Sequence, residues 1–348
     1  MAETKERIPY ISRIRTVASF AIVVLHTFTM YHMAMKDEMT GTEEYVTRVV
    51  PWLMMWAVPC FVMVTGILFL DEKKNLTIGR LLFRYVLRMV IVLLLFTAIF
   101  FVLDIWMNKE SFSSGDLFSI LKKFFTDGSW AHLWYLYLLI GLYLLMPAYR
   151  LVAKNAGKET LIYLGIVLLI FLSLIPTWER LGGESPGFYI CVSSVFPLYL
   201  FLGHMIHRGD FKFGMIMGAI LLLAGTVTII ILSRIDFGER QAGMEKLLGN
   251  YAFLPVIILS TGAFVLLRGK NGSAGGKMSK VWTFLDKYSF GVYLTHLIYL
   301  RFLIKVVKWN PLEYGSFWML IPVVIAVYAL SLVTSMGLKL IPGLKKLL

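Results

Sequence analysis

The first apolar stretch of the chain joins an arginine to a histidine: RTVASFAIVVLH begins at Arg15 and ends at His26. Arginine binds anions and imidazole exchanges protons near neutral pH, so the pair could hold a ligand and react with it. In a helix the two side chains would lie on one face, about 16 Å apart. Such a polar face points toward water or a bound molecule. A structural role is also open, with Arg15 anchored at the membrane surface and His26 bonded to a neighbouring helix.

A second basic face opens at GRLLFRYVLRMV, where Arg80, Arg84 and Arg88 recur every four residues and would line one side of a helix. Anchoring at the membrane surface accounts for Arg80 and Arg84. Arg88 would lie well within the apolar region, where it needs an anion or a carboxylate. Because we expect no acidic residue deep in a span, the pattern favours a phosphorylated molecule that enters from the cytoplasm.

Two further segments combine histidine with aromatic residues. AHLWYLYLLIGLYLLMP carries His132 and Trp134 at the start of an apolar stretch, which is typical of an interfacial aromatic belt but also suits a sugar. SFGVYLTH places Ser289, Tyr293 and His296 on one helix face. A ladder of helix-packing hydrogen bonds is the simpler interpretation of this second segment.

The elements that must position these residues are membrane-spanning helices. The chain has 348 residues, of which 58% are hydrophobic and 16% charged, well below the roughly 25% charged residues of an ordinary globular protein. Apolar runs of about 20 residues, long enough to cross a bilayer, recur along it. We therefore predict one all-α domain over residues 1–348, a bundle of about ten transmembrane helices at 9–33, 49–70, 82–106, 131–149, 160–176, 188–207, 213–233, 250–268, 284–306 and 316–341.

The charge pattern predicts how this bundle sits in the membrane. Lysine and arginine are concentrated in segments that share one side, so we expect both termini in the cytoplasm. The net charge of +13 suits anionic lipids or an anionic substrate and gives no reason to expect nucleic acid. The Gly/Ser-rich segment 268–280 reads as a flexible cytoplasmic loop. Cys60 and Cys191 both fall in apolar spans, so we expect neither a disulfide nor a metal site.

Taken together, these segments resemble the acyltransferase-3 family of bacterial membrane O-acyltransferases. The resemblance rests on Arg15 and His26, on the arginines that open the third span, and on VPCFVMVTGILFL, HLWYLYLLIGLYLLMP, FPLYLFLG and SFGVYLTH, in family order over almost the whole chain. Within the family it is most similar to short forms without a fused extracellular domain, among them an O-acetyltransferase acting on a surface glycan and the membrane domain of a serine racemase. Where the family often has an acidic residue or Asn, three positions before its arginine, this chain has Ser12.

The resemblance implies a mechanism. Acetyl-CoA or another acyl-CoA would bind from the cytoplasm, with its phosphates on Arg84 and Arg88 and with Arg15 at a phosphate or carbonyl. His26, which matches the family's invariant histidine, would take the proton of an acceptor hydroxyl as that hydroxyl attacks the thioester. A direct acyl-imidazole is the rival chemistry. Tyr293 or His296 would orient His26, while His132 and Trp134 would seat the acceptor.

The expected acceptor is a cell-envelope glycan or lipid-linked sugar, and the expected location is the bacterial cytoplasmic membrane. A transporter of a small hydrophilic solute such as an amino acid remains the alternative, and a scaffold protein whose polar faces only join helices is a third reading. The sequence names neither the acyl group nor the acceptor, and it does not give the oligomeric state.

Overall fold

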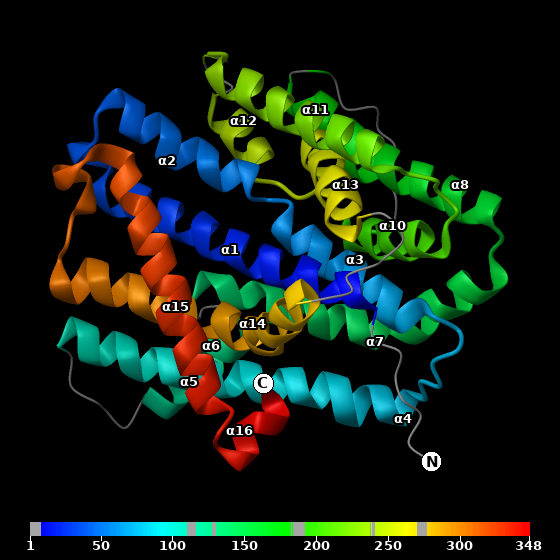
Figure 1. The fold of residues 1–348 in the computed structure, drawn as a ribbon, viewed down its shortest axis with the longest axis horizontal. Helices are drawn as coiled ribbons and strands as arrows, with labels where there is room; N and C mark the ends of the chain where they lie inside the picture. Colours follow the sequence, from blue (N-terminus) through cyan, green and yellow to red (C-terminus); the bar gives the residue numbers. More distant parts are fainter. Residues whose placement is uncertain are drawn as a thin grey trace.

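The structure is a computed structural model that describes residues 8–109, 116–126, 130–181, 183, 192–236, 238, 241–269 and 277–348. Over these residues the chain is helical and has no strand. Cys191 and most of the predicted 268–280 loop lie outside the described residues. The helices pack into one bundle, with α1 crossing its middle and the other helices around it (Figure 1).

The described residues form α-helices, π-helical turns and 3₁₀ turns. The α-helices are α1 Pro9–Met35, α2 Gly41–Leu53, α3 Ala57–Leu70, α4 Ile78–Arg80, α5 Leu87–Asn108, α6 Asp116–Phe125, α7 Trp134–Asn155, α8 Lys158–Leu169, α9 Ile175–Arg180, α10 Phe196–Arg208, α11 Met215–Arg234, α12 Gln241–Leu248, α13 Leu254–Arg268, α14 Lys277–Arg301, α15 Leu320–Leu338 and α16 Pro342–Leu347. The π-helical turns are Leu81–Val86, Ile170–Leu174 and Phe302–Val307, and the 3₁₀ turns are Lys36–Glu38, Ala131–Leu133, Pro311–Tyr314 and Ser316–Met319.

Each of the ten predicted spans overlaps a helix among the described residues. Among the described residues, eight helical segments are long and apolar enough to cross a membrane: Pro9–Glu38, Gly41–Leu70, Ile78–Asn108, Ala131–Asn155, Lys158–Arg180, Met215–Arg234, Met278–Val307 and Ser316–Leu338. The other two predicted spans correspond to the shorter helices α10 and α13. The chain is therefore a multi-pass membrane protein whose described residues form helices and no strand.

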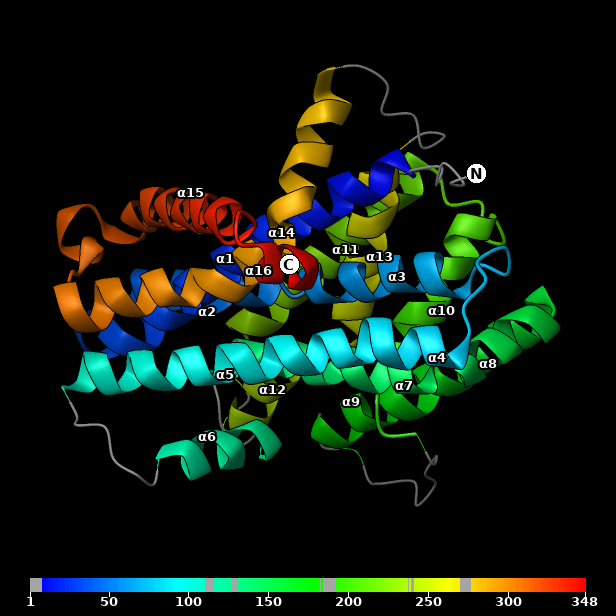
Figure 2. The same ribbon diagram turned by 90° about the horizontal axis from the view of Figure 1, so that it is seen from below.

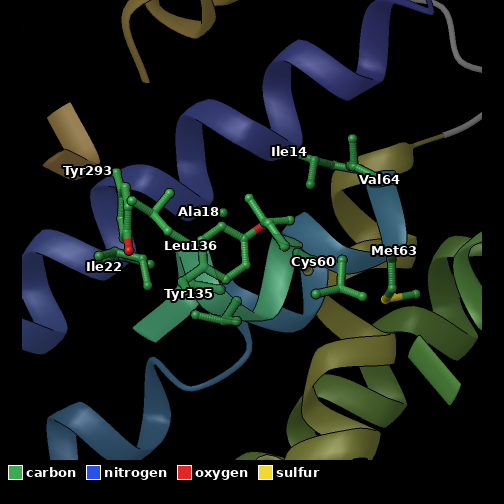
Figure 3. Close-up of a cluster of buried hydrophobic side chains, with 14 of the residues drawn as sticks. Ile14, Ala18, Ile22, Cys60, Met63, Val64, Tyr135, Leu136 and Tyr293 are labelled. Atoms are coloured by element: carbon green, nitrogen blue, oxygen red, sulfur yellow. The ribbon is translucent and has the colours of Figure 1, made fainter. Parts of the chain in front are cut away.

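The core forms where α1 meets α3, α7 and α14. Figure 3 shows Ile14, Ala18 and Ile22 of α1 close to side chains from these three helices. α14 bends, so that its second part runs beside α5 at one end of the bundle (Figure 2). α14 also packs against α1, which brings residues from the two ends of the sequence together.

Two glycines allow α3 and α10 to pack backbone to backbone. A Cβ at Gly66 would lie 1.9 Å from the carbonyl oxygen of Leu200, and a Cβ at Gly203 would lie 2.3 Å from that of Met63. Neither helix backbone can move by so much without repacking its neighbours. The glycines of the VTG and FLG motifs are thus required by packing.

This contact predicts a stability effect. We expect Gly203→Ala to lower the free energy of unfolding by about 1–3 kcal/mol, the usual cost of overpacking. Gly141→Ala is the matched control, because a Cβ at Gly141 meets nothing within 4 Å. Thermal unfolding of the purified variants, followed by circular dichroism, measures the difference. Equal melting temperatures for the two variants would contradict the close α3–α10 contact.

Candidate active site

Three histidines from three separate segments meet in the bundle. His26 of α1, His132 of the turn before α7 and His296 of α14 form a triangle whose ring centroids are 5.0, 5.4 and 6.4 Å apart. His132 and His296 are buried, and His26 is partly exposed. The contact between His26 and His296 agrees with the expectation that His296 lies where it can orient His26. His132 has ring contacts with the other two histidines, and its expected role in seating the acceptor stays a prediction.

The hydrogen bonds of these rings define which nitrogens carry protons. The Nδ1 of His26 lies 3.0 Å from the carbonyl oxygen of Ile22, and the Nδ1 of His296 lies 3.2 Å from that of Val292. A carbonyl oxygen only accepts, so both Nδ1 atoms donate. The Nε2 of His296 then accepts from the Nδ1 of His26 at 3.3 Å. In this arrangement the Nε2 of His26 keeps its lone pair, which is the state a general base needs.

His132 keeps an acceptor atom unused. Its Nε2 lies 3.3 Å from the carbonyl oxygen of Leu294 and so donates, which leaves a lone pair on Nδ1. Among the described residues this buried Nδ1 has no hydrogen-bond partner. A buried polar atom without a partner costs about 1–3 kcal/mol, so a hydroxyl or water that donates to Nδ1 would be favoured. Tyr293 holds this segment by donating its hydroxyl to the carbonyl oxygen of His132.

A cavity of about 250 Å³, which we call the arginine cavity, extends from Arg15 and Arg88 toward the histidines. Its walls are apolar and aromatic, with Phe61, Tyr85, Tyr135 and Tyr143 among them. It also reaches Ile22 and Tyr293, which bond to His26 and to the main chain of His132. One part of the cavity is therefore cationic, and another part lies beside the histidine triangle.

The cationic end contains one carboxylate that the sequence reasoning missed. An ion pair joins Arg15 Nη1 to Asp286 Oδ1 at 3.3 Å, and the hydroxyl of Ser12 donates to Asp286 Oδ2 at 2.9 Å. The expected lack of acidic residues deep in the spans applies to Arg88, and for Arg15 the structure provides this carboxylate. Asp286 of α14 thus contacts both Ser12 and Arg15 of α1. It stands three residues before Ser289 in the sequence, but only the α1–α14 contact shows that it pairs with Arg15.

Further cations surround this end. Lys339 follows α15 and donates to the carbonyl oxygen of Lys287. Burial, together with the positive charges of Lys287, Arg88 and Arg15, lowers the pKa of Lys339. One carboxylate among these four cations leaves an excess of positive charge, which an anionic ligand would offset.

The arginines of the third span lie in different environments. The helix that carries Arg80, Arg84 and Arg88 includes a π-helical turn at Leu81–Val86. Arg88 is partly buried and lines the arginine cavity, whereas Arg84 is exposed and is not among the residues that line it. Arg88 Nε donates to the carbonyl oxygen of Leu347 at 2.8 Å, and Leu348 also lines the cavity.

The structure places Trp134 away from the histidines. Its ring packs on Phe196 and Tyr251 at centroid distances of 5.8 and 5.4 Å, near the start of α10 and α13. Helix packing in this aromatic cluster explains the position of Trp134. Trp134 and His132, which lie two residues apart, thus belong to different environments.

A charged pair inside two predicted spans was also missed. Arg301 Nη1 forms an ion pair with Asp104 Oδ1 at 2.5 Å, and Trp130 Nε1 donates to Asp104 Oδ2 at 2.8 Å. The Trp130 ring stacks on Phe100, which contacts His132 at a centroid distance of 5.3 Å. The signal was available, because an ionisable residue inside an apolar span is costly and usually functional.

Comparison with known families identifies the family of the chain. A family profile described as an acyltransferase domain matches residues 8–339. The chain belongs to the acyltransferase-3 family. The match includes every residue of the histidine triangle and both arginines of the cavity. No curated protein and no solved structure matches the chain. As a member of this family, the protein is a membrane acyltransferase.

Proposed function

We propose that this acyltransferase-3 protein moves an acyl group, by default acetyl, from acyl-CoA to a hydroxyl of a cell-envelope glycan or lipid-linked sugar. The observation that carries the proposal is the arginine cavity, because it combines guanidinium groups at one end with the neighbourhood of His26 at the other. The proposed setting is the bacterial cytoplasmic membrane, with Arg15 and Arg88 at the cytoplasmic end.

The donor fits the cavity by its chemistry. CoA carries phosphates, which Arg88 and the cations around Lys339 would bind, and a long pantetheine arm that suits an apolar, aromatic wall. Arg15 is already paired with Asp286, so its side chain is held in place at the cavity wall. We assign Arg15 to a phosphate or carbonyl contact, and we assign phosphate binding to Arg88 ahead of Arg84.

The reaction follows from the protonation states of the histidines. The acceptor hydroxyl gives its proton to the Nε2 of His26 as its oxygen attacks the thioester carbonyl carbon. An ester C–O bond forms, the C–S bond breaks, and the thiolate of CoA takes the proton from His26. His296 accepts a hydrogen bond from the Nδ1 of His26 and so keeps this imidazole in the reactive orientation. A general base of this kind contributes about 10²–10⁴-fold to the rate.

Transfer of labelled acetyl groups tests the proposal. Membrane vesicles from bacteria that express the chain would be incubated with acetyl-CoA labelled in its acetyl group, and vesicles with an empty vector serve as the control. We expect the label to appear in the glycan or lipid-linked sugar fraction only when the chain is present. Mild alkali should release it as acetate, because esters hydrolyse under conditions in which amides persist. Label that stays in acetyl-CoA would contradict the proposal.

A further inference from the structure

The short helix α16 lies against the cationic end of the arginine cavity. It follows α15 after a turn at residues 339–341, and its main contact is with α5 (Figure 1). Arg88 Nε donates to the carbonyl oxygen of Leu347, and Leu348 lines the cavity beside Arg15 and Arg88. The family profile ends at residue 339, so α16 lies outside the part of the chain that matches it.

The two sides of this segment differ in chemistry. Leu348 is only 8% exposed, and Leu344 and Leu347 are partly buried and pack against the core of the bundle. Lys345 and Lys346 are exposed. The segment 342–348 therefore turns apolar side chains and one main-chain carbonyl toward the bundle, and two ammonium groups away from it.

The attachment of α16 to the bundle is slight. The helix has six residues, and the turn that leads into it exposes Leu340 by 83% and Ile341 by 51%. Segments that bury little apolar surface open at a small cost in free energy, whereas the long helices around the cavity cannot move without repacking the core. Of the segments that line the arginine cavity, the one with Leu348 is thus the easiest to displace.

The size of the cavity requires that something move when a large donor binds. Its volume is about 250 Å³, while pockets that enclose a drug-sized ligand have about 300–1,000 Å³. CoA, with a nucleotide, a pyrophosphate and a pantetheine arm, is larger than most drugs. The Nε of Arg88 is also occupied by Leu347, so the guanidinium cannot offer its Nε edge to a phosphate while α16 is in place.

From these contacts we propose that α16 is a lid of the donor site, closed in this structure, and that it moves away to admit acyl-CoA. Opening withdraws Leu348 from the cavity and frees the Nε of Arg88. This inference rests on the proposed function and adds a control of donor entry. The apparent affinity of a site that is open for only part of the time falls in proportion to the open fraction, so contacts that hold the lid closed weaken donor binding.

Loosening the lid from outside the cavity tests this. Leu344 packs against the core but does not line the cavity. In full-length protein in lipid nanodiscs, we expect Leu344→Ser to tighten acetyl-CoA binding by about threefold or more, measured by titration calorimetry. Leu340→Ser is the matched control, because Leu340 is 83% exposed and its loss should leave the affinity unchanged. Weaker or unchanged binding in Leu344→Ser, or the same gain in both variants, overturns the lid.

The movement itself can be followed with a cysteine at position 348. Leu348 is buried in the closed state, so Leu348→Cys should react slowly with a maleimide. Acetyl-CoA should accelerate this reaction by about fivefold or more, as the open state becomes the main one. Mass spectrometry reads the labelling at this position alone. Lys346→Cys, at an exposed position, is the control and should react at a similar rate with and without acetyl-CoA. A rate at position 348 that acetyl-CoA leaves unchanged or lowers contradicts the lid.

The outcomes separate the lid from the proposed function. If the wild-type protein and Leu344→Ser bind acetyl-CoA equally well, the lid is wrong and the proposed donor remains. If neither protein binds acetyl-CoA, the proposed function fails, and the lid fails with it.

Discussion

Replacement of His26 by alanine should lower acyl transfer by about 10²–10⁴-fold while acetyl-CoA still binds with its normal affinity. The imidazole of His26 is the proposed general base, so its loss slows transfer. It does not line the arginine cavity, whose cations would hold the donor, so donor binding should persist. His26→Gln should behave in the same way, because an amide cannot accept the proton near neutral pH. Transfer is measured with labelled acetyl-CoA and affinity by titration calorimetry, on the same purified protein.

A second histidine of α1 provides the matched control. His32 lies on the same helix and bonds to Thr47 Oγ1 at 3.0 Å, outside the histidine triangle. His32→Ala should therefore retain transfer within about twofold. If His26→Ala loses donor binding and transfer together, His26 is a structural residue and the assignment of the base is wrong.

Replacement of Arg88 by alanine should weaken acetyl-CoA binding at least tenfold. Arg88 is the arginine of its helix that lines the cavity, and a charge-assisted hydrogen bond to a phosphate is worth about 1.5–3 kcal/mol. The effect should shrink as ionic strength rises, because salt screens the attraction between guanidinium and phosphate. Titration calorimetry at two salt concentrations measures both effects.

Arg84 serves as the comparison for Arg88, one turn away on the same helix. Arg84 is exposed and lies outside the cavity lining, so Arg84→Ala should change the affinity much less than Arg88→Ala. Arg88→Lys separates charge from geometry, since an ammonium keeps the charge but not the paired hydrogen bonds. Equal losses for Arg84→Ala and Arg88→Ala would place the phosphates at the membrane surface, contrary to our assignment.

The sequence predicted well the features that depend on one membrane span alone. Apolar runs of bilayer length predicted where the helices lie, because lipid requires the backbone to be paired within the segment. The spacing of Arg15 and His26 correctly put both residues on the inward part of α1. The i, i+4, i+7 pattern of Ser289, Tyr293 and His296 likewise marked the face of α14 that meets α1.

The sequence was less informative where distant segments meet. The pairing of Arg15 with Asp286 and the contact of His132 with His26 join residues far apart in the chain, and no local pattern encodes such a contact. The exposure of Arg84 and the partial burial of Arg88 depend on how their helix packs, which the four-residue spacing of the two arginines does not encode. Asp104 and Arg301 could have been found, because charges inside apolar spans are rare.

Binding of acetyl-CoA compared with S-acetylpantetheine is the most direct test of the central claim. Both carry the same thioester and the same arm, but only acetyl-CoA carries the phosphates that the cations around Arg88 would hold. Titration calorimetry on the wild-type protein in nanodiscs should show saturable binding of acetyl-CoA and binding of S-acetylpantetheine that is at least tenfold weaker. Equal affinities, or the absence of saturable acetyl-CoA binding, would contradict the claim that the arginine cavity is a CoA donor site.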